Sequence, residues 1–243
     1  MAKEKTKKFK QDRKLWFRIF KWFIKIRYRR PKFVYLGEKP TTQSVILTNH
    51  IGARVPLTLE LYADFPMRYW GTHEMNTSFK MLYKHMTVDY YHEILRWNIH
   101  LARLFCLIAA PLTYLFYKGL RLVSTYKDYR FRKSIDESIE LIKDGNNIVI
   151  FPENSEDGYL DELKEFYPGF VLFCERALKR GYDLPIFASY LRRKTNTFMF
   201  DKPIMFSELK KMHQNKYDMA KYLLDRTNDL GKMDLKLIPK YGT

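Results

Sequence analysis

The sequence predicts an α/β fold, in which a mostly parallel or mixed central sheet is flanked by helices and preceded by an N-terminal basic amphipathic helix. Short β-rich runs alternate with segments of helical periodicity, and residues 45–47 and 148–150 are continuously apolar. Continuous apolar runs are typical of strands that helices cover on both faces. The formal charge is +17, and residues 1–32 hold 14 Lys and Arg against Glu4 and Asp12. Most of the charge therefore belongs to an N-terminal arm.

The sequence predicts two parts, a basic arm at residues 1–34 and an α/β domain at residues 35–243. At 243 residues the chain is long enough for one full hydrophobic core, and its 46% hydrophobic content excludes a disordered protein. Charged residues interrupt the apolar positions of the arm every three or four residues. A cleavable signal peptide needs an unbroken apolar stretch, so we expect the arm to remain on the protein.

The residue pattern of the arm predicts a helix, and Pro31 ends this helix. On a helical wheel of roughly 100° per residue, the cations cluster within about 60° and the large apolar residues spread over the other side. The cations are Lys14, Arg18, Lys21 and Lys25, and the apolar residues are Leu15, Trp16, Ile19, Phe20, Phe23 and Ile26. Such a helix favours peripheral binding to an anionic membrane surface, here at the cytoplasmic face. Two alternatives stay open: a helix packed on its own domain, and an RNA-binding arm. No nucleic-acid motif elsewhere supports the second, so no nucleic acid is expected.

Residues 104–117 form a second apolar segment, with no charge between Arg103 and Lys118 and with Pro111 near its middle. Fourteen residues are too few to span a bilayer comfortably, so a buried or interfacial helix is favoured over a transmembrane one.

The cysteines and histidines predict no metal site. Cys106 and Cys174 each lie in an apolar run without a closely spaced partner, which favours two buried thiols over a disulfide. The histidines at positions 73, 85, 92 and 100 do not form the zinc-binding pattern His-Glu-x-x-His.

The remaining elements follow from local patterns. Helices are expected from residue 56, within 78–117, at 131–142 before Gly145, at 170–180 and from residue 207. Strands are expected at 44–48, 67–70, 121–125, 147–151, 185–190, 197–200 and 203–206. Reactive groups in open α/β sheets gather beyond the carboxyl ends of strands. Three polar clusters stand at such ends: Asn49-His50, Lys127 with Arg130, and Glu153-Asn154-Ser155.

Over roughly residues 40–206 the order of blocks resembles the glycerolipid (lysophospholipid and glycerol-3-phosphate) acyltransferases. Val-Ile-Leu-Thr-Asn-His (45–50) is similar to the family's first motif, and Ile-Val-Ile-Phe-Pro-Glu-Asn-Ser (148–155) to its Phe-Pro-Glu-Gly-Thr motif. Phe-Tyr-Pro-Gly-Phe (166–170), Leu-Pro-Ile (184–186) and Lys-Pro-Ile (202–204) resemble later blocks.

The sequence departs from the family pattern in each of its first three motifs. The family places an Asp five positions after the His, to orient the imidazole, whereas this chain has Val55 there, with Arg54 beside it. Lys127 stands nearest to the family's phosphate-binding Arg. Asn154 and Ser155 replace the Gly and Thr of the third motif.

The resemblance implies direct acyl transfer from a thioester to a lipid hydroxyl, with His50 as general base and Glu153 as a second catalytic residue that binds or orients the acceptor. It also implies an oxyanion site at the backbone of residues 52–53. Substrate contacts are expected from Asn49, Lys127, Arg130, Asn154 and Ser155. The acid that orients His50 stays open between Glu74, Glu60 and Glu153.

The expected co-substrate is acyl-CoA or an acyl carrier protein thioester, with no tightly bound cofactor and no metal. The expected acceptor is a lysophospholipid, lysophosphatidate or a related lipid at the membrane surface. A catalytically impaired, lipid-binding relative of the acyltransferases is the alternative.

Overall fold

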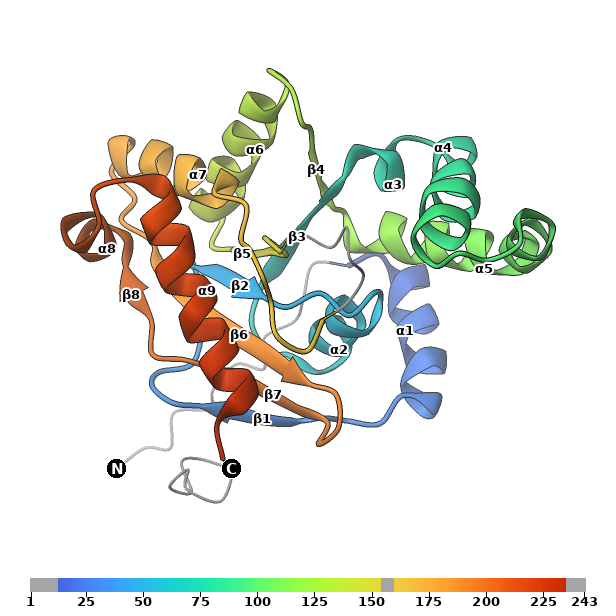
Figure 1. Cartoon of the computed structure of the whole chain (residues 1–243), viewed down its shortest axis with the longest axis horizontal. Coiled ribbons are helices and arrows are strands. Elements are labelled where there is room, and N and C mark those ends of the chain that lie inside the picture. Colours follow the sequence, from blue (N-terminus) through green and yellow to red (C-terminus); the bar gives the residue numbers. More distant parts are fainter. Residues whose placement is uncertain (1–12, 154–159, 235–243) are drawn as a thin grey trace.

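The structure is a computed structural model and describes residues 13–153 and 160–234. Its centre is an eight-stranded sheet with the order β1-β7-β6-β2-β5-β3-β4, and β8 pairs with β6 (Figure 1). The strands are β1 (Lys32–Tyr35), β2 (Val45–Thr48), β3 (Met67–Thr72), β4 (Val123–Thr125), β5 (Asn147–Ile150), β6 (Pro185–Arg192), β7 (Thr197–Phe200) and β8 (Ile204–Met205). Five neighbouring strands, from β6 to β4, run parallel, whereas β7 and β8 are antiparallel to β6. The predicted mixed, mostly parallel α/β class is confirmed.

Helices cover both faces of the sheet because the buried strands are apolar on both sides. On β2, Val45 and Leu47 belong to one core cluster and Ile46 to the other. The first cluster includes residues of α6 (Phe131–Lys143), α7 (Gly169–Lys179), α8 (Phe206–Met212) and α9 (Lys216–Lys232). The second includes residues of α1 (Leu15–Arg27), α2 (Arg54–Tyr62) and α5 (Ile99–Leu120).

The N-terminal helix α1 is anchored to the domain. Phe17 is fully buried in the second core cluster, and Arg13 makes a buried ion pair with Glu60 of α2, with 2.9 Å between Nη2 and Oε2. Lys21 contacts the same carboxylate at 2.7 Å. After Pro31, β1 joins the sheet beside β7. Residues 13–34 thus share the core and the sheet of the domain that follows, and residues 1–12 of the predicted arm lie outside the described residues.

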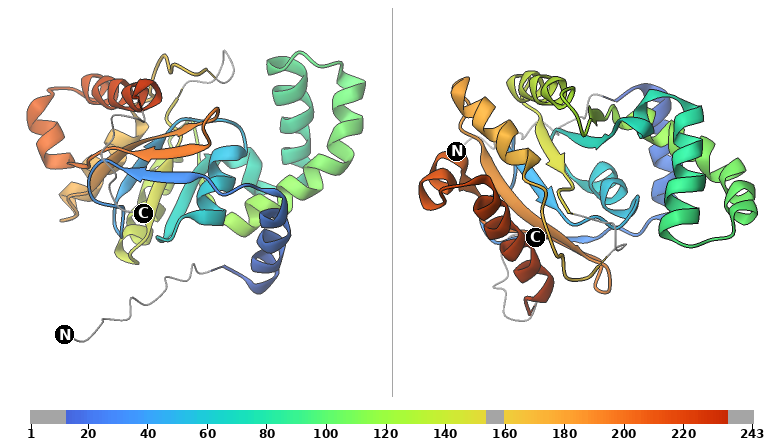
Figure 2. Two further views of the ribbon diagram at one scale, coloured as in Figure 1. Left: turned by 90° about the horizontal axis from the view of Figure 1, so that it is seen from below. Right: turned by 45° about the horizontal axis from the view of Figure 1, so that its top comes forward.

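Between β3 and β4 the chain leaves the sheet and returns to it. It runs through α3 (His73–Thr77), α4 (Phe79–Lys84) and the π-helix η1 (His85–Ile94), and then comes back along α5. These helices form a projection at one end of the molecule (Figure 2). The apolar helix expected within residues 104–117 extends over 22 residues, because the flanking cations Arg103 and Lys118 lie within it. By length and composition, α5 could cross a membrane.

Candidate active site

The carboxyl ends of the parallel strands β2, β5, β3 and β4 meet at one edge of the sheet. Leu47 pairs with Ile150, so the same offset carried three residues further sets His50 level with Glu153. Tyr69 pairs with Val149, and Trp70 with Val123. Continuing these registers places His73 and Tyr126 in the same row. His50, Glu153, His73 and Tyr126 therefore follow the ends of successive strands of the sheet, and such strands lie about 4.8 Å apart.

His50 follows β2 and is largely removed from solvent. Its ring lies against Phe151, with 5.0 Å between the ring centroids. Burial lowers the pKa of the imidazole to about 4, because the charged form loses its hydration. His50 is therefore neutral at physiological pH, and a neutral imidazole carries the lone pair that a proton acceptor requires.

Asn49 fixes the position of His50. Its side chain is buried, its Oδ1 accepts a hydrogen bond from the Leu191 backbone N–H at 2.8 Å, and its Nδ2 donates to the Leu191 carbonyl at 3.3 Å. The amide thus bonds to β6 much as a neighbouring strand does. The polar atoms of Asn49 thus hold the end of β2 to β6, and its contact with substrate stays a prediction.

The turn after His50 leads into α2. Gly52 has φ +50°, a conformation that favours glycine, and the Arg54 N–H donates to the Ile51 carbonyl at 3.0 Å. Val55 is fully buried in the core. The position at which the acyltransferase motif carries an Asp therefore faces the apolar interior.

Glu153 is the second titratable residue at this edge, and it is 8% exposed. Burial raises the pKa of its carboxyl to about 7, and the nearby backbone N–H of His50 partly opposes that rise. Neither oxygen makes a hydrogen bond of normal geometry to the described residues. Since buried carboxylate oxygens are nearly always hydrogen-bonded, the two oxygens can accept a donor from a bound molecule.

The segment after the third motif supports Glu153 from the other side. Glu153 forms an isolated antiparallel bridge with Phe166, and the Tyr167 N–H donates to the Pro152 carbonyl at 2.7 Å. The block Phe-Tyr-Pro-Gly-Phe (166–170), which resembles a later block of the family, therefore lies alongside Glu153. The predicted contacts Asn154 and Ser155 lie outside the described residues.

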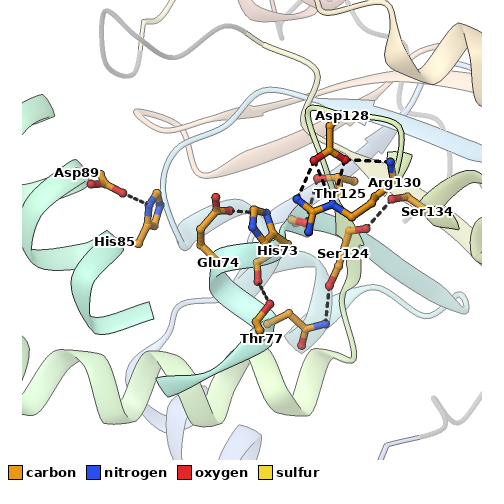
Figure 3. A network of polar contacts seen from close by, with 12 residues as sticks. His73, Glu74, Thr77, His85, Asp89, Ser124, Thr125, Asp128, Arg130 and Ser134 are labelled. Carbon is orange, nitrogen blue, oxygen red and sulfur yellow. Dashed lines mark hydrogen bonds and ion pairs between the residues drawn. The ribbon is translucent and has the colours of Figure 1, made fainter. Parts of the chain in front are cut away.

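The predicted cationic pair follows β4. Arg130 forks onto Asp128, with bonds of 2.7–3.0 Å, and its guanidinium lies 4.5 Å from the centroid of the Tyr126 ring (Figure 3). The Arg130 side chain holds the pKa of the Asp128 carboxyl down at about 2. Lys127 is exposed. Because Asp128 neutralises Arg130, Lys127 is the cation of this pair that is better placed to attract an anion.

The two candidate acids for His50 are engaged elsewhere. Oε2 of Glu74 lies 3.1 Å from Nδ1 of His73, whose ring stacks on Tyr126 at 4.9 Å (Figure 3). Glu60 is bound by Arg13 and Lys21 on the far side of α2. Of the three candidate acids, Glu153 is the one that lies near His50. Its carboxyl group is close to the backbone N–H of His50.

His73 and Tyr126 are site-edge residues that sequence reasoning missed. Both occupy the first position after a parallel strand. This position was the feature of the sequence that could have identified them as site residues. Their level with Glu153 follows from the strand offsets, which a single sequence does not reveal.

No protein-family model matches the sequence, and no curated protein matches it. Among solved structures, the chain is similar to the crystal structure of the 1-acyl-sn-glycerophosphate (LPA) acyltransferase PlsC from Thermotoga maritima. The TM-score is 0.48 and the sequence identity 12%, over 92% of this chain and 77% of that chain. The functional proposal depends on the side chains of this chain.

Proposed function

We propose that this protein transfers a fatty acyl group from a thioester to the hydroxyl of a lysophospholipid or related lipid acceptor at the cytoplasmic surface of a membrane. One observation carries the proposal. His50 and Glu153 end neighbouring parallel strands, and both are withdrawn from solvent, with pKa values shifted to about 4 and about 7. Titratable groups with strongly shifted pKa values at the carboxyl edge of an α/β sheet are typical of active sites.

The proposed chemistry is a direct transfer. A ring nitrogen of His50 takes the proton of the acceptor hydroxyl while the oxygen attacks the thioester carbonyl carbon. The carbon–sulfur bond then breaks, and the imidazolium returns the proton to the departing thiolate. General-base assistance of this kind contributes roughly 10²- to 10⁴-fold to a rate.

Glu153 orients the acceptor in this proposal. Its two buried oxygens accept hydrogen bonds from hydroxyl groups of the acceptor, which satisfies atoms that otherwise lack partners among the described residues. When ionised, the carboxylate also stabilises the imidazolium that forms beside it. Both contributions are strongest in the transition state, where His50 carries a charge.

Lys127 attracts the acceptor's anionic headgroup in this proposal, and Arg130 assists once its bond to Asp128 loosens. Lys127 and Arg130 follow β4, three strands from β2, or roughly 14 Å at about 4.8 Å per strand. This distance suits a long-range electrostatic contact with a phosphate better than a contact at the reacting carbon.

The test is an acyl-transfer assay with the full chain in mixed micelles, labelled palmitoyl-CoA or palmitoyl-acyl carrier protein, and a panel of lyso-acceptors. We expect a labelled diacyl product, and we expect His50→Gln to lower kcat at least about 100-fold. His213→Gln is the matched control, because His213 follows α8 on the opposite side of the molecule (Figure 1). No product with any donor and acceptor, or equal rates for His50→Gln and wild type, contradicts the proposal.

A second candidate is a lipid-binding protein without turnover. The low pKa of His50 favours it, because a base with a pKa of about 4 takes a proton from a hydroxyl less readily than one near neutrality. Saturable binding of lyso-lipid without any labelled product in the same assay identifies this function.

A further inference from the structure

Large apolar side chains are exposed together on two helices at one end of the molecule. On α1 they are Leu15, Trp16, Ile19, Trp22, Phe23 and Ile26, and on α5 they are Leu101, Leu104, Phe105, Leu107, Ile108, Leu112 and Leu115. We call these residues the apolar surface. Soluble proteins rarely expose contiguous apolar patches larger than a few hundred Å². This surface therefore needs a partner that covers it.

The two faces of α1 are divided between the domain and the outside. Phe17 is buried and Phe20 packs on the same core cluster. At roughly 100° per residue, the exposed residues Leu15, Ile19, Trp22 and Ile26 lie on the opposite side of the helix. The bond from Lys21 to Glu60 holds α1 in this orientation. The inner face of α1 thus packs against the domain, and its apolar outer face points away from the domain.

The helix α5 is divided in the same way. Its buried face carries Ala102, Cys106 and Ala110. Cys106 and Ala110 pack in one cluster with Leu82 of α4 and Met86 of η1. Its outer face carries Leu104, Ile108 and Leu112, whose exposed fractions are 66%, 74% and 52%. An exposed fraction this large, repeated every fourth residue, gives a continuous aliphatic stripe along the helix.

The helix α1 packs against the C-terminal end of α5. Phe17 packs directly over Gly119 near the end of α5, where an added Cβ would lie 2.0 Å from the Phe17 ring. Phe17 also contacts Phe116 of α5, with ring centroids 6.0 Å apart. Figure 2 shows α1 alongside the end of α5. The exposed stripes of the two helices therefore lie at the same end of the molecule.

The chemistry of the surface fits a lipid bilayer better than a protein. The α5 stripe between Leu104 and Leu115 has no charged side chain, whereas protein interfaces carry about one hydrogen bond per 100–200 Å². Three of the four tryptophans, Trp16, Trp22 and Trp97, are exposed at this end, and tryptophan is enriched at the level of lipid headgroups. The cations Lys14, Arg18 and Lys25 flank the apolar face of α1, and Arg103 and Lys118 flank that of α5. These charges complement an anionic surface.

The topology restricts how deeply α5 can enter. β3 and β4, which precede and follow the α3–α5 projection, pair in parallel in one sheet. A single crossing by α5 would require the chain to return through the bilayer along α4 and η1. Those helices carry Lys84, His85, Asp89 and Glu93, and charges at the bilayer centre are costly. An in-plane position keeps them on the water side.

We propose that α5 and α1 together embed their outer faces in a single leaflet of an anionic bilayer, with α5 lying in the membrane plane rather than spanning it. This inference rests on the proposed function, which places the protein at a membrane, and extends it by identifying the surface that contacts the lipid. It also gives a place to the apolar pocket of about 550 Å³ at the start of α5, lined by Trp97, Asn98, Leu101, Leu104 and Phe105. That pocket is largely open to its surroundings and lies within the region proposed to be embedded.

The first test is flotation of the full chain with vesicles of phosphatidylcholine and phosphatidylglycerol. The triple variant Leu104→Ser, Ile108→Ser, Leu112→Ser removes the α5 stripe, and we expect its partition coefficient to fall by about 100-fold. The matched control removes three exposed apolar side chains from α7, α8 and α9, with Leu172→Ser, Met212→Ser and Tyr217→Ser. We expect it to bind like wild type. Equal binding of the α5 variant and wild type overturns the inference.

The second test distinguishes lying in the plane from spanning. Ile108 is near the middle of α5, so Ile108→Trp in a background of Trp16→Phe, Trp22→Phe and Trp97→Phe reports the depth of that position. Trp70 stays, and its indole donates to Ser138 inside the protein. We expect the strongest quenching from lipids brominated near the headgroup end of the acyl chain. Strongest quenching by bromines at the bilayer centre means a spanning helix and overturns the inference.

A second copy of the chain is the other possible occupant, and sedimentation without lipid tests it. A wild-type dimer that the α5 triple variant dissociates, together with absent vesicle binding, overturns the inference in favour of self-association. The outcomes also separate this inference from the chemistry. Vesicle binding without acyl transfer contradicts the proposed function alone, whereas transfer in micelles without vesicle binding contradicts the inference alone.

Discussion

Replacing Glu153 by Gln makes the protein more stable at alkaline pH, because the folded chain resists ionising this buried carboxyl. The pKa of Glu153 moves from an ordinary value of 4.5 to about 7 in the fold. Between these two values the unfolded chain has lost the proton and the folded chain keeps it. The unfolded state then binds fewer protons, so the free energy of unfolding falls as the pH rises.

The magnitude follows from the same two pKa values. At about 1.36 kcal/mol per pH unit, the interval from 4.5 to about 7 corresponds to about 3 kcal/mol of lost stability, complete just above pH 7. Gln has nearly the shape of protonated Glu and does not ionise. Glu153→Gln therefore matches wild type near pH 4 and exceeds it by about 3 kcal/mol at pH 8, or by about 8 °C in Tm.

The assay is thermal or urea unfolding of both proteins at several pH values from 4 to 8, in which the difference between them isolates Glu153. Glu208→Gln, at an exposed position on α8, is the control and shows no such pH-dependent difference. In the acyl-transfer assay Glu153→Gln is impaired although it is more stable, which is expected of a group kept for function. A stability difference that stays constant from pH 4 to pH 8 refutes the assignment of the raised pKa to burial.

Three further predictions concern the anchoring of α1 and the end of β2. Glu60→Gln leaves Arg13 buried without its counterion and lowers the free energy of unfolding by about 3–5 kcal/mol in urea titration, and a second change, Arg13→Met, restores part of the loss. Gly119→Ala places a Cβ against the Phe17 ring, displaces α1 and accelerates limited proteolysis after Lys14 or Arg18, whereas Gly231→Ala, a contact of 3.2 Å with Tyr190, has the smaller effect. Asn49→Ala removes both bonds to the Leu191 backbone, which costs about 2–3 kcal/mol in unfolding and also lowers kcat because His50 loses its support. Intact stability or unchanged proteolysis in the respective variant contradicts each expectation.

The central strands could be predicted because each carries its own signal. The apolar runs at 45–47 and 148–150 need no distant partner to be recognised, and they form β2 and β5. Their polar continuations contain His50 and Glu153, which follow these two paired strands. Which strands are neighbours in the sheet, however, is determined by strand pairing and cannot be read from a single sequence.

What could not be predicted depends on contacts between distant segments. The strand β1 was missed because Lys32–Tyr35 is a short edge strand with one buried residue, and the pattern of the basic arm masked it. Lys21 was expected on the basic face of an amphipathic helix and Phe20 on its apolar face. In the structure Lys21 binds Glu60 and Phe20 packs on the core, whereas Trp22 is exposed. Glu60 and Glu74 remained open as partners of His50, because a sequence does not show which cation each carboxylate meets.

The packing of Phe17 against Gly119 and Phe116 has a consequence for the synthesis of the protein on the ribosome. The helix α1 precedes its counterion Glu60 and its contact Gly119 in the chain, so it is synthesised before both. Domains form during synthesis as their parts emerge, so a nascent chain that ends before Glu60 carries α1 with both of its faces unburied. During that interval the helix is free to meet a targeting factor or the lipid surface before it meets its own domain. The order of the residues along the chain thus allows α1 to reach the membrane before the domain folds around it.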